Sequence, residues 1–141
     1  MKTRRFSRKS PAVYDINYHL IFVTKYRKHV LEGNVADYLE RVLHDVATKR
    51  KLEIISISIS PGHVHLFIGA DPLQPPYDII KSFKGISSFK LFKQFPALQI
   101  HLWNGRSWSP GYWVSTAGLI SSETVKKYIE NQETEEMARK S

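Results

Sequence analysis

Residues 54–70, IISISISPGHVHLFIGA, decide the fold. Hydrophobic and polar residues alternate over 54–60 and again over 63–70, and this period of two is typical of β-strands with one buried face. Pro61 and Gly62, between the two runs, are a common turn signal. The stretch therefore predicts a β-hairpin with a tight turn at Pro61-Gly62.

Tight pairing across this turn would place Ser60 opposite His63 and Ser58 opposite His65, and directly opposed residues share a face of the sheet. One face of the hairpin would then be aliphatic and join the core, with Ile55, Ile57, Ile59, Val64, Leu66 and Ile68. The open face would carry Ser56, Ser58, Ser60, His63, His65 and Phe67. A loop with an odd number of residues would reverse this parity, but the tight register buries every isoleucine and exposes every serine.

Helices and strands alternate along the rest of the chain. Runs rich in β-branched and aromatic residues predict further strands over 15–24, 98–103 and 111–116. Apolar residues at helical spacing, together with a possible cap at Ser121 or Ser122, predict helices over about 34–50, 76–93 and 123–135. The order β-α-β-β-α-β followed by a last helix predicts an α+β fold, a ferredoxin-like (RRM-like) sandwich. Its helices would cover one face of an antiparallel sheet, and the other face would be open to a ligand or a partner.

The composition favours a single basic domain. The chain has 141 residues, 42% of them hydrophobic, and a formal net charge of +8, which is enough apolar material for one core. It has no cysteine, which excludes a disulfide framework, a thiolate nucleophile and a Cys-ligated metal. It also lacks the roughly 20-residue apolar run of a membrane span and the apolar segment of a secretory signal. We therefore expect a soluble intracellular domain without a membrane anchor.

Positive charge is concentrated before the first acidic residue, Asp15. Five cations precede it: Lys2, Arg4, Arg5, Arg8 and Lys9. We expect a basic arm over 1–13 that contacts phosphates, with a solvated tail as the alternative. The main domain would span 14–133, followed by a tail over 134–141. A second basic cluster, over residues 25–28, includes an aromatic ring and suits contacts to single-stranded nucleic acid, although an ordinary charged loop would look the same.

Two histidines on one face of a strand indicate a metal site. His63 and His65 are two residues apart, so their imidazoles lie side by side, and imidazole is the commonest metal-binding side chain near neutral pH. Taken alone, most such pairs are half-buried strand residues. The remaining histidines lack a same-face partner in the sequence and are expected to be structural or surface residues; they are His19, His29, His44 and His101.

A third ligand must come from elsewhere in the chain. Tyr128 and Gln132 are four residues apart in the expected last helix and so lie on the same side of it. A tyrosine beside an amide is usually packing and capping. Tyrosine can attack phosphorus once it is ionised, but its reference pKa of about 10 means that it needs a nearby metal or base.

Five segments together resemble the single-tyrosine HUH transposases, the IS-two-hundred-like enzymes that move insertion sequences as single-stranded DNA. They are YHLIFVTKYRK (18–28), PGHVHLFI (61–68), IIKSFKGISS (79–88), WSPGYWVSTAG (108–118) and VKKYIENQ (125–132). The resemblance covers about residues 14–133. Gly62 departs from the family pattern, which commonly has Asp there, and the chain thereby lacks a carboxylate beside its first histidine ligand.

The resemblance implies that Tyr128 is the nucleophile and that His63, His65 and Gln132 hold a divalent cation, Mg²⁺ or Mn²⁺. The cation would bind a non-bridging oxygen of the scissile phosphate. Attack by Tyr128 would leave a 5′-phosphotyrosine and a free 3′-hydroxyl, and the reverse step would join new ends without a nucleotide cofactor. Family members are homodimers in which the tyrosine helix can complete the partner's site. Gly118 would be the hinge for that helix, with a helix-start turn as the alternative.

The implied DNA partner is a hairpin near each end of the element, together with the adjacent single strand. Our candidates for phosphate contacts are the basic side chains of the arm, of the 25–28 cluster and of one helix: Arg4, Arg5, Arg8, Lys9, Lys25, Arg27, Lys28, Lys81 and Lys84. Such a protein would act in the cytoplasm of a prokaryotic cell, on the nucleoid when bound to DNA.

Two alternatives stay open. The first is a domesticated relative that binds and cuts repetitive hairpins without moving its own gene. The second is a non-catalytic RNA- or DNA-binding domain on the same scaffold. A binding domain of that kind would place exposed aromatic residues on the central strands of its sheet.

Overall fold

The computed structural model describes residues 16–98, 108–116 and 130–131. The predicted basic arm, with Arg4, Arg5, Arg8 and Lys9, lies outside the described residues. So do Gly118, Tyr128, Gln132 and the tail over 134–141. The predicted strand over 98–103 is described only at Leu98, which is buried and not in a strand. Of the predicted last helix, Glu130 and Asn131 are described and are helical.

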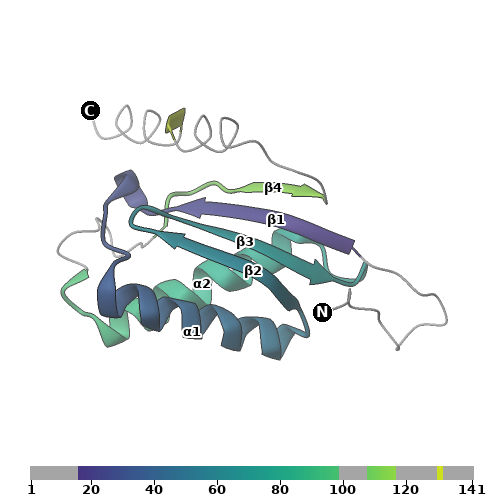
Figure 1. Cartoon of the computed structure of the whole chain (residues 1–141), viewed down its shortest axis with the longest axis horizontal. Coiled ribbons are helices and arrows are strands. Elements are labelled where there is room, and N and C mark those ends of the chain that lie inside the picture. The colour runs from purple at the N-terminus through teal and green to yellow at the C-terminus, as the bar shows by residue number, and fades with distance from the viewer. Residues whose placement is uncertain (1–15, 99–107, 117–129, 132–141) are drawn as a thin grey trace.

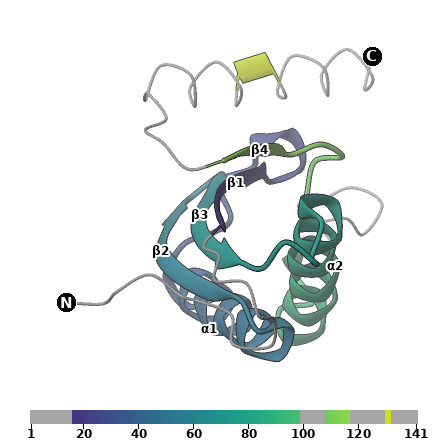
Figure 2. The same ribbon diagram turned by 90° about the vertical axis from the view of Figure 1, so that its right-hand side faces the viewer.

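Four strands and two long helices make up the described fold (Figure 1). In chain order they are β1 (Ile16–Val23), α1 (Gly33–Arg50), β2 (Glu53–Ser60), β3 (His63–Ala70), α2 (Pro76–Gln94) and β4 (Trp113–Thr116), with a short 3-10 helix, η1 (Lys25–Arg27), after β1. The strands pair antiparallel in the order β2-β3-β1-β4. Both helices lie on one face of this sheet (Figure 2). The predicted ferredoxin-like α+β fold is confirmed. No helix within the described ranges is long and apolar enough to cross a membrane.

The core lies between the sheet and the two helices. Leu20 and Phe22 of β1, Leu66 of β3, Leu39 of α1 and Phe83 of α2 are all fully buried there. In β1 and β3 the core residues are spaced by two, so the residues between them point to the opposite face of the sheet. The alternation that predicts the hairpin also separates these two faces.

The hairpin has the predicted register, with one exception. Ser60 pairs with His63 and Ser58 pairs with His65. The prediction that Ile55 joins the core is wrong, because the register shifts between Ile54 and Ser56 and Ile55 is 41% exposed. A β-bulge adds one residue to a strand and so exchanges its two faces from that point on. Ile54 packs against the core instead.

The loop after β1 is tied to the Pro61-Gly62 turn. The Thr24 backbone N–H donates to the Gly62 carbonyl at 3.0 Å, and the Leu31 N–H donates to the Pro61 carbonyl at 3.0 Å. Within the loop, Tyr26 and Arg27 have φ values of 56° and 53°. This left-handed region costs a non-glycine residue roughly 1–2 kcal/mol. The anchoring bonds therefore hold a strained basic loop against the start of β3.

Candidate functional site

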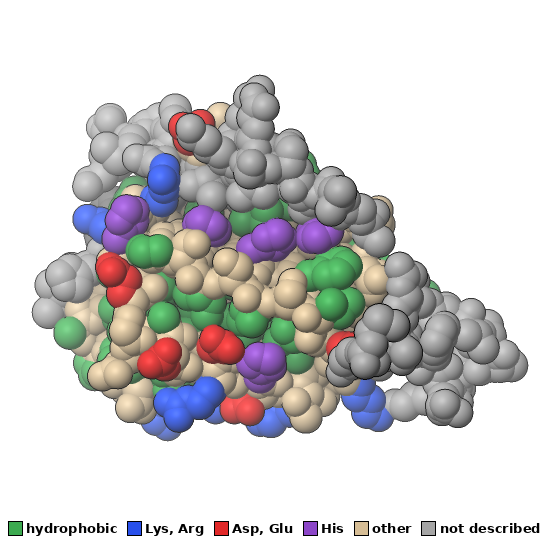
Figure 3. Space-filling view, in the orientation of Figure 1, with side chains coloured by type: hydrophobic (Ala, Val, Ile, Leu, Met, Phe, Trp, Pro, Cys, Tyr) green, Lys and Arg blue, Asp and Glu red, His purple; other side chains and the backbone are tan. Residues whose placement is uncertain are grey.

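The sheet face turned away from the helices carries the candidate site. We call it the histidine face and define it by His19 of β1 and His63, His65 and Phe67 of β3. The aliphatic residues between them on the two strands belong to the core, so these four side chains point the other way. A row of histidine side chains is visible along the molecule in Figure 3.

His19 joins the predicted pair. Its Nδ1 lies 3.2 Å from Nε2 of His65, within hydrogen-bond distance. The expectation that His19 lacks a histidine partner is therefore wrong. The two residues are 46 positions apart, and their proximity depends on the pairing of β1 with β3. The only sequence signal for this contact is a histidine within the predicted first strand. That signal does not show which residue of another strand the histidine will face.

The histidine face favours neutral imidazoles. Burial lowers the pKa of His63, and the positive charges of Arg27 and His65 lower it further. Burial also lowers the pKa of His65, with His19 as the second cause. Each of these effects disfavours the protonated ring. The lowered pKa values favour the neutral form of both rings near pH 7, which is the form that binds a cation.

This donor set fits part of a divalent metal site. Two adjacent neutral imidazoles can fill two coordination positions, and a mixed set of nitrogen and oxygen ligands suits Mn²⁺. The described residues contain no group of three His, Cys, Asp or Glu side chains that could hold a metal. The predicted third ligand, Gln132, lies outside the described residues, as does the predicted nucleophile, Tyr128.

The predicted basic cluster lies beside the histidine pair. Arg27 packs so closely on Gly62 that a Cβ added there would lie 3.2 Å from the Arg27 Cγ. Lys25 places its ammonium 5.4 Å from the centre of the Tyr26 ring, and Lys28 is exposed. The loop that carries all three cations thus adjoins the residue before His63. A side chain at position 62, such as the Asp of the family pattern, would therefore require the Arg27 loop to shift.

The two predicted lysines of α2 lie on the helix side of the sheet (Figure 2). Lys84 donates from Nζ to the backbone carbonyls of Ser109 at 2.8 Å and Gly111 at 2.9 Å, and so ties α2 to the segment before β4. Lys81 is exposed and lies 5.7 Å from the centre of the Tyr77 ring. Lys84 therefore has a structural role that the sequence did not predict, and its role in DNA binding stays a prediction.

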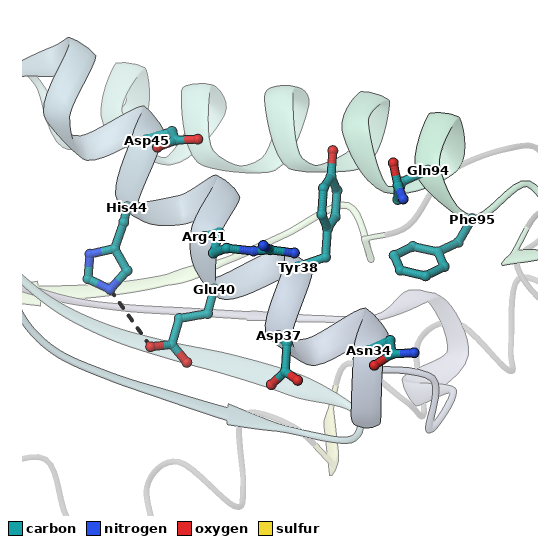
Figure 4. Close-up of a pocket in the computed structure, with 9 residues that line it drawn as sticks. All are labelled: Asn34, Asp37, Tyr38, Glu40, Arg41, His44, Asp45, Gln94 and Phe95. Atoms are coloured by element: carbon teal, nitrogen blue, oxygen red, sulfur yellow. Dashed lines mark ion pairs between the residues drawn. The ribbon is translucent and has the colours of Figure 1, made fainter.

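A hollow of about 930 Å³ lies elsewhere, along α1 and the end of α2 (Figure 4). Three carboxylates line it, those of Asp37, Glu40 and Asp45. His44 faces Glu40 there at 3.9 Å. Arg41 also lines the hollow, but the carboxylates outnumber this one guanidinium, and a net negative lining disfavours the phosphates of a nucleic acid. The histidine face remains the candidate site.

Comparisons with known proteins find relatives over most of the chain. The family model described as "Transposase IS200 like" matches residues 12–132. The ISDra2 transposase TnpA of Deinococcus radiodurans is 41% identical to this chain over 124 residues, which cover 88% of this chain and 89% of that protein. A crystal structure described as that of a transposase from the same species superposes with a TM-score of 0.83 at 40% identity, over 89% of this chain and 97% of that chain.

Proposed function

This chain belongs to the family of IS200-like transposases, and from this membership we propose that it cleaves and rejoins single-stranded DNA at the ends of an insertion sequence. The observation that carries the proposal is the pair of neutral imidazoles on the histidine face beside a basic loop. Imidazoles bind a divalent cation, and the loop suits the phosphates on either side of it.

In this proposal Tyr128 is the nucleophile. Its phenolic oxygen forms a bond to phosphorus while the bond to the 3′-oxygen breaks, and the departing oxygen takes up a proton. A 5′-phosphotyrosine and a free 3′-hydroxyl result. Because one phosphodiester replaces another, a different 3′-hydroxyl can reverse the step and join new ends without a nucleotide cofactor.

His63, His65 and Gln132 would hold Mg²⁺ or Mn²⁺ in the same proposal. The bound ion would neutralise charge that develops on the scissile phosphate and would lower the pKa of a nearby phenol. The lowered pKa values of His63 and His65 support these roles, since they favour the neutral rings that bind a cation.

The DNA would be a hairpin with its adjacent single strand. Lys25, Arg27 and Lys28 would contact phosphates next to the scissile one, and the N-terminal arm would contact phosphates further away. A homodimer in which Gly118 lets the Tyr128 helix reach either subunit's site completes the proposal.

A denaturing gel tests the chemistry. The protein is incubated with Mn²⁺ and a hairpin-bearing single-stranded oligonucleotide taken from the DNA that flanks the gene. We expect a covalent adduct with the wild type and none with Tyr128→Phe, which should still bind the hairpin. Tyr77→Phe is the matched control, because Tyr77 is 57% exposed on α2, away from the histidine face. An adduct with Tyr128→Phe would refute the assignment of the nucleophile.

The metal assignment has its own test. His63→Ala combined with His65→Ala should abolish cleavage, whereas His44→Ala, on α1, should leave it unchanged. Undiminished cleavage in excess chelator would contradict metal dependence while leaving Tyr128 in place as the nucleophile.

One observation favours the non-catalytic binding domain as the second candidate. Phe67 and His19 are aromatic residues on the two central strands of the sheet, β3 and β1. Ferredoxin-like domains that bind single strands use such positions to stack bases. The adduct assay separates the candidates, since a pure binding domain forms no covalent product.

A further inference from the structure

One row across the sheet has an arrangement that the metal site does not explain. Phe67 of β3 pairs with His19 of β1, and the outer partners in the same row are Ser56 on β2 and Ser115 on β4. The rings of Phe67 and His19 stack, with 4.4 Å between their centres and 18° between their planes. Two aromatic rings at the centre are thus flanked by the smallest hydroxyl side chains.

The stack determines which way Phe67 faces. Neighbouring strands are roughly 4.8 Å apart, and the two ring centres are separated by nearly the same distance. The rings therefore stand upright on the sheet and face one another across the strands. One face of the Phe67 ring is covered by His19, and the other turns toward β2, where its partner Ser56 is exposed.

Ser56 is too small to cover an aromatic ring. Phe67 is half-buried and is not part of the apolar core that the described residues form. The bulge next to Ser56 also leaves Ile55, the preceding residue of β2, 41% exposed. An upright ring with one face over a serine is a suitable surface for a flat aromatic ligand.

The spacing along β3 links this surface to the histidine pair. Phe67 is two residues beyond His65 on the same face, a separation of roughly 7 Å. Adjacent phosphates of an extended single strand are separated by a similar distance. A strand whose scissile phosphate lies at His63 and His65 would therefore bring the base of a neighbouring nucleotide to Phe67.

We propose that Phe67, held upright by His19, stacks on a base of single-stranded DNA one nucleotide from the scissile phosphate. The inference rests on the proposed function, because that function places the phosphate at the histidine pair. Stacking tolerates any base, since each base has a π-face. The surface would therefore set the position of the strand and contribute little to the choice of sequence.

Binding measured without cleavage tests this proposal. Fluorescence anisotropy in chelator would follow a labelled hairpin with its adjacent single strand, taken from the DNA that flanks the gene. Phe67→Leu, which keeps an apolar side chain and removes the ring, should weaken binding roughly 5- to 150-fold. Phe67→Trp should bind at least as well as the wild type. Phe89→Leu is the matched control, since Phe89 is 68% exposed on α2 and should have no effect.

An abasic scan identifies the stacked base. Each nucleotide near the cleavage position is replaced in turn by one that has no base. We expect one position where the wild type loses affinity and where Phe67→Leu loses nothing further. Equal abasic losses in both proteins, or wild-type affinity in Phe67→Leu, would overturn the proposal. Thermal melting of each variant shows whether it is folded. If Phe67→Leu does not fold, Phe67→Trp still tests the proposal, because it should bind at least as well as the wild type.

The two proposals can fail separately. If the wild type forms the Tyr128 adduct but shows no base that depends on Phe67, the stacking surface is refuted and the chemistry stands. If the base dependence is present and no adduct forms, the chemistry is refuted together with the placement of this base beside a scissile phosphate, and only the stacking on Phe67 stands.

Discussion

Replacement of Gly62 by alanine should destabilise the fold through a contact with the basic loop. An added Cβ would lie 3.2 Å from the Cγ of Arg27, 3.3 Å from the Arg27 carbonyl oxygen and 3.4 Å from Cδ2 of His29. These separations are shorter than ordinary van der Waals contacts. Gly62 does not have a positive φ, so the close approach, and not the backbone conformation, is what requires glycine here.

The carbonyl contact decides the sign of the effect. The two side chains can move aside, but the backbone of Arg27 is held by its N–H bond to the Thr24 carbonyl at 2.8 Å. The Thr24 hydroxyl also donates to the Lys28 carbonyl at 2.7 Å. Overpacking of this kind lowers the free energy of unfolding by about 1–3 kcal/mol. Alanine also restricts the unfolded chain more than glycine does, which raises the free energy of unfolding by about 0.4–1 kcal/mol. We expect a net loss of about 1–2 kcal/mol in the free energy of unfolding, or roughly 2–8 °C in Tm.

Urea unfolding of two alanine variants provides the assay. Gly85 is exposed in the middle of α2, and a Cβ there would meet nothing within 4 Å. Gly85→Ala should therefore stabilise the protein by about 0.5–1 kcal/mol. In Gly62→Ala, displacement of Arg27 should also raise the pKa of His63 toward its ordinary value, which NMR titration would detect. If both variants are stabilised, the loop is not held as described and the reasoning is refuted.

Three further outcomes are expected. Stability should fall as the pH is lowered below about 6.5, because the folded state lowers the pKa values of His63 and His65 and the unfolded chain therefore binds more protons. Unfolding measured at several pH values checks this, and replacing both histidines by Gln should flatten the dependence of stability on pH. Lys84→Met should lower the free energy of unfolding by about 1–2 kcal/mol, because two carbonyls lose a charged donor. Lys81→Met should change it by no more than about 0.5 kcal/mol. If urea unfolding shows both variants to be as stable as the wild type, Lys84 does not have the structural role described. His19→Phe should weaken Mn²⁺ binding roughly tenfold or more, measured by electron paramagnetic resonance, because the group that orients His65 is lost. His19→Asn should retain most of the affinity, and equal affinities in the two variants would show that the hydrogen bond is unimportant.

Local patterns predicted the parts of the fold that depend on neighbours in sequence. The two-residue turn at Pro61-Gly62 sets the parity of the hairpin, and alternation then assigns His63 and His65 to the same face. The bulge at Ile55 was not predicted, because either Ile54 or Ile55 could face the core in the segment EIISISIS. Which of the two does so depends on how the start of β2 pairs with the end of β3. The pattern of side chains in one strand gives no information about this pairing.

The surroundings of the histidine pair depend on contacts that are distant in sequence, and these govern its chemistry. His19 reaches His65 only because β1 lies beside β3, and Arg27 lowers the pKa of His63 only because the loop after β1 is bonded to the turn before β3. The short motif thus supplies the ligands, while strand pairing supplies their charge environment and the stacked ring beside them. A chain with the same His-Val-His motif but no cation at position 27 would keep the two imidazoles, and we expect a higher pKa for His63 alone, because burial and His19 lower the pKa of His65. The properties of the site therefore follow from the β1–β3 pairing as much as from the motif itself.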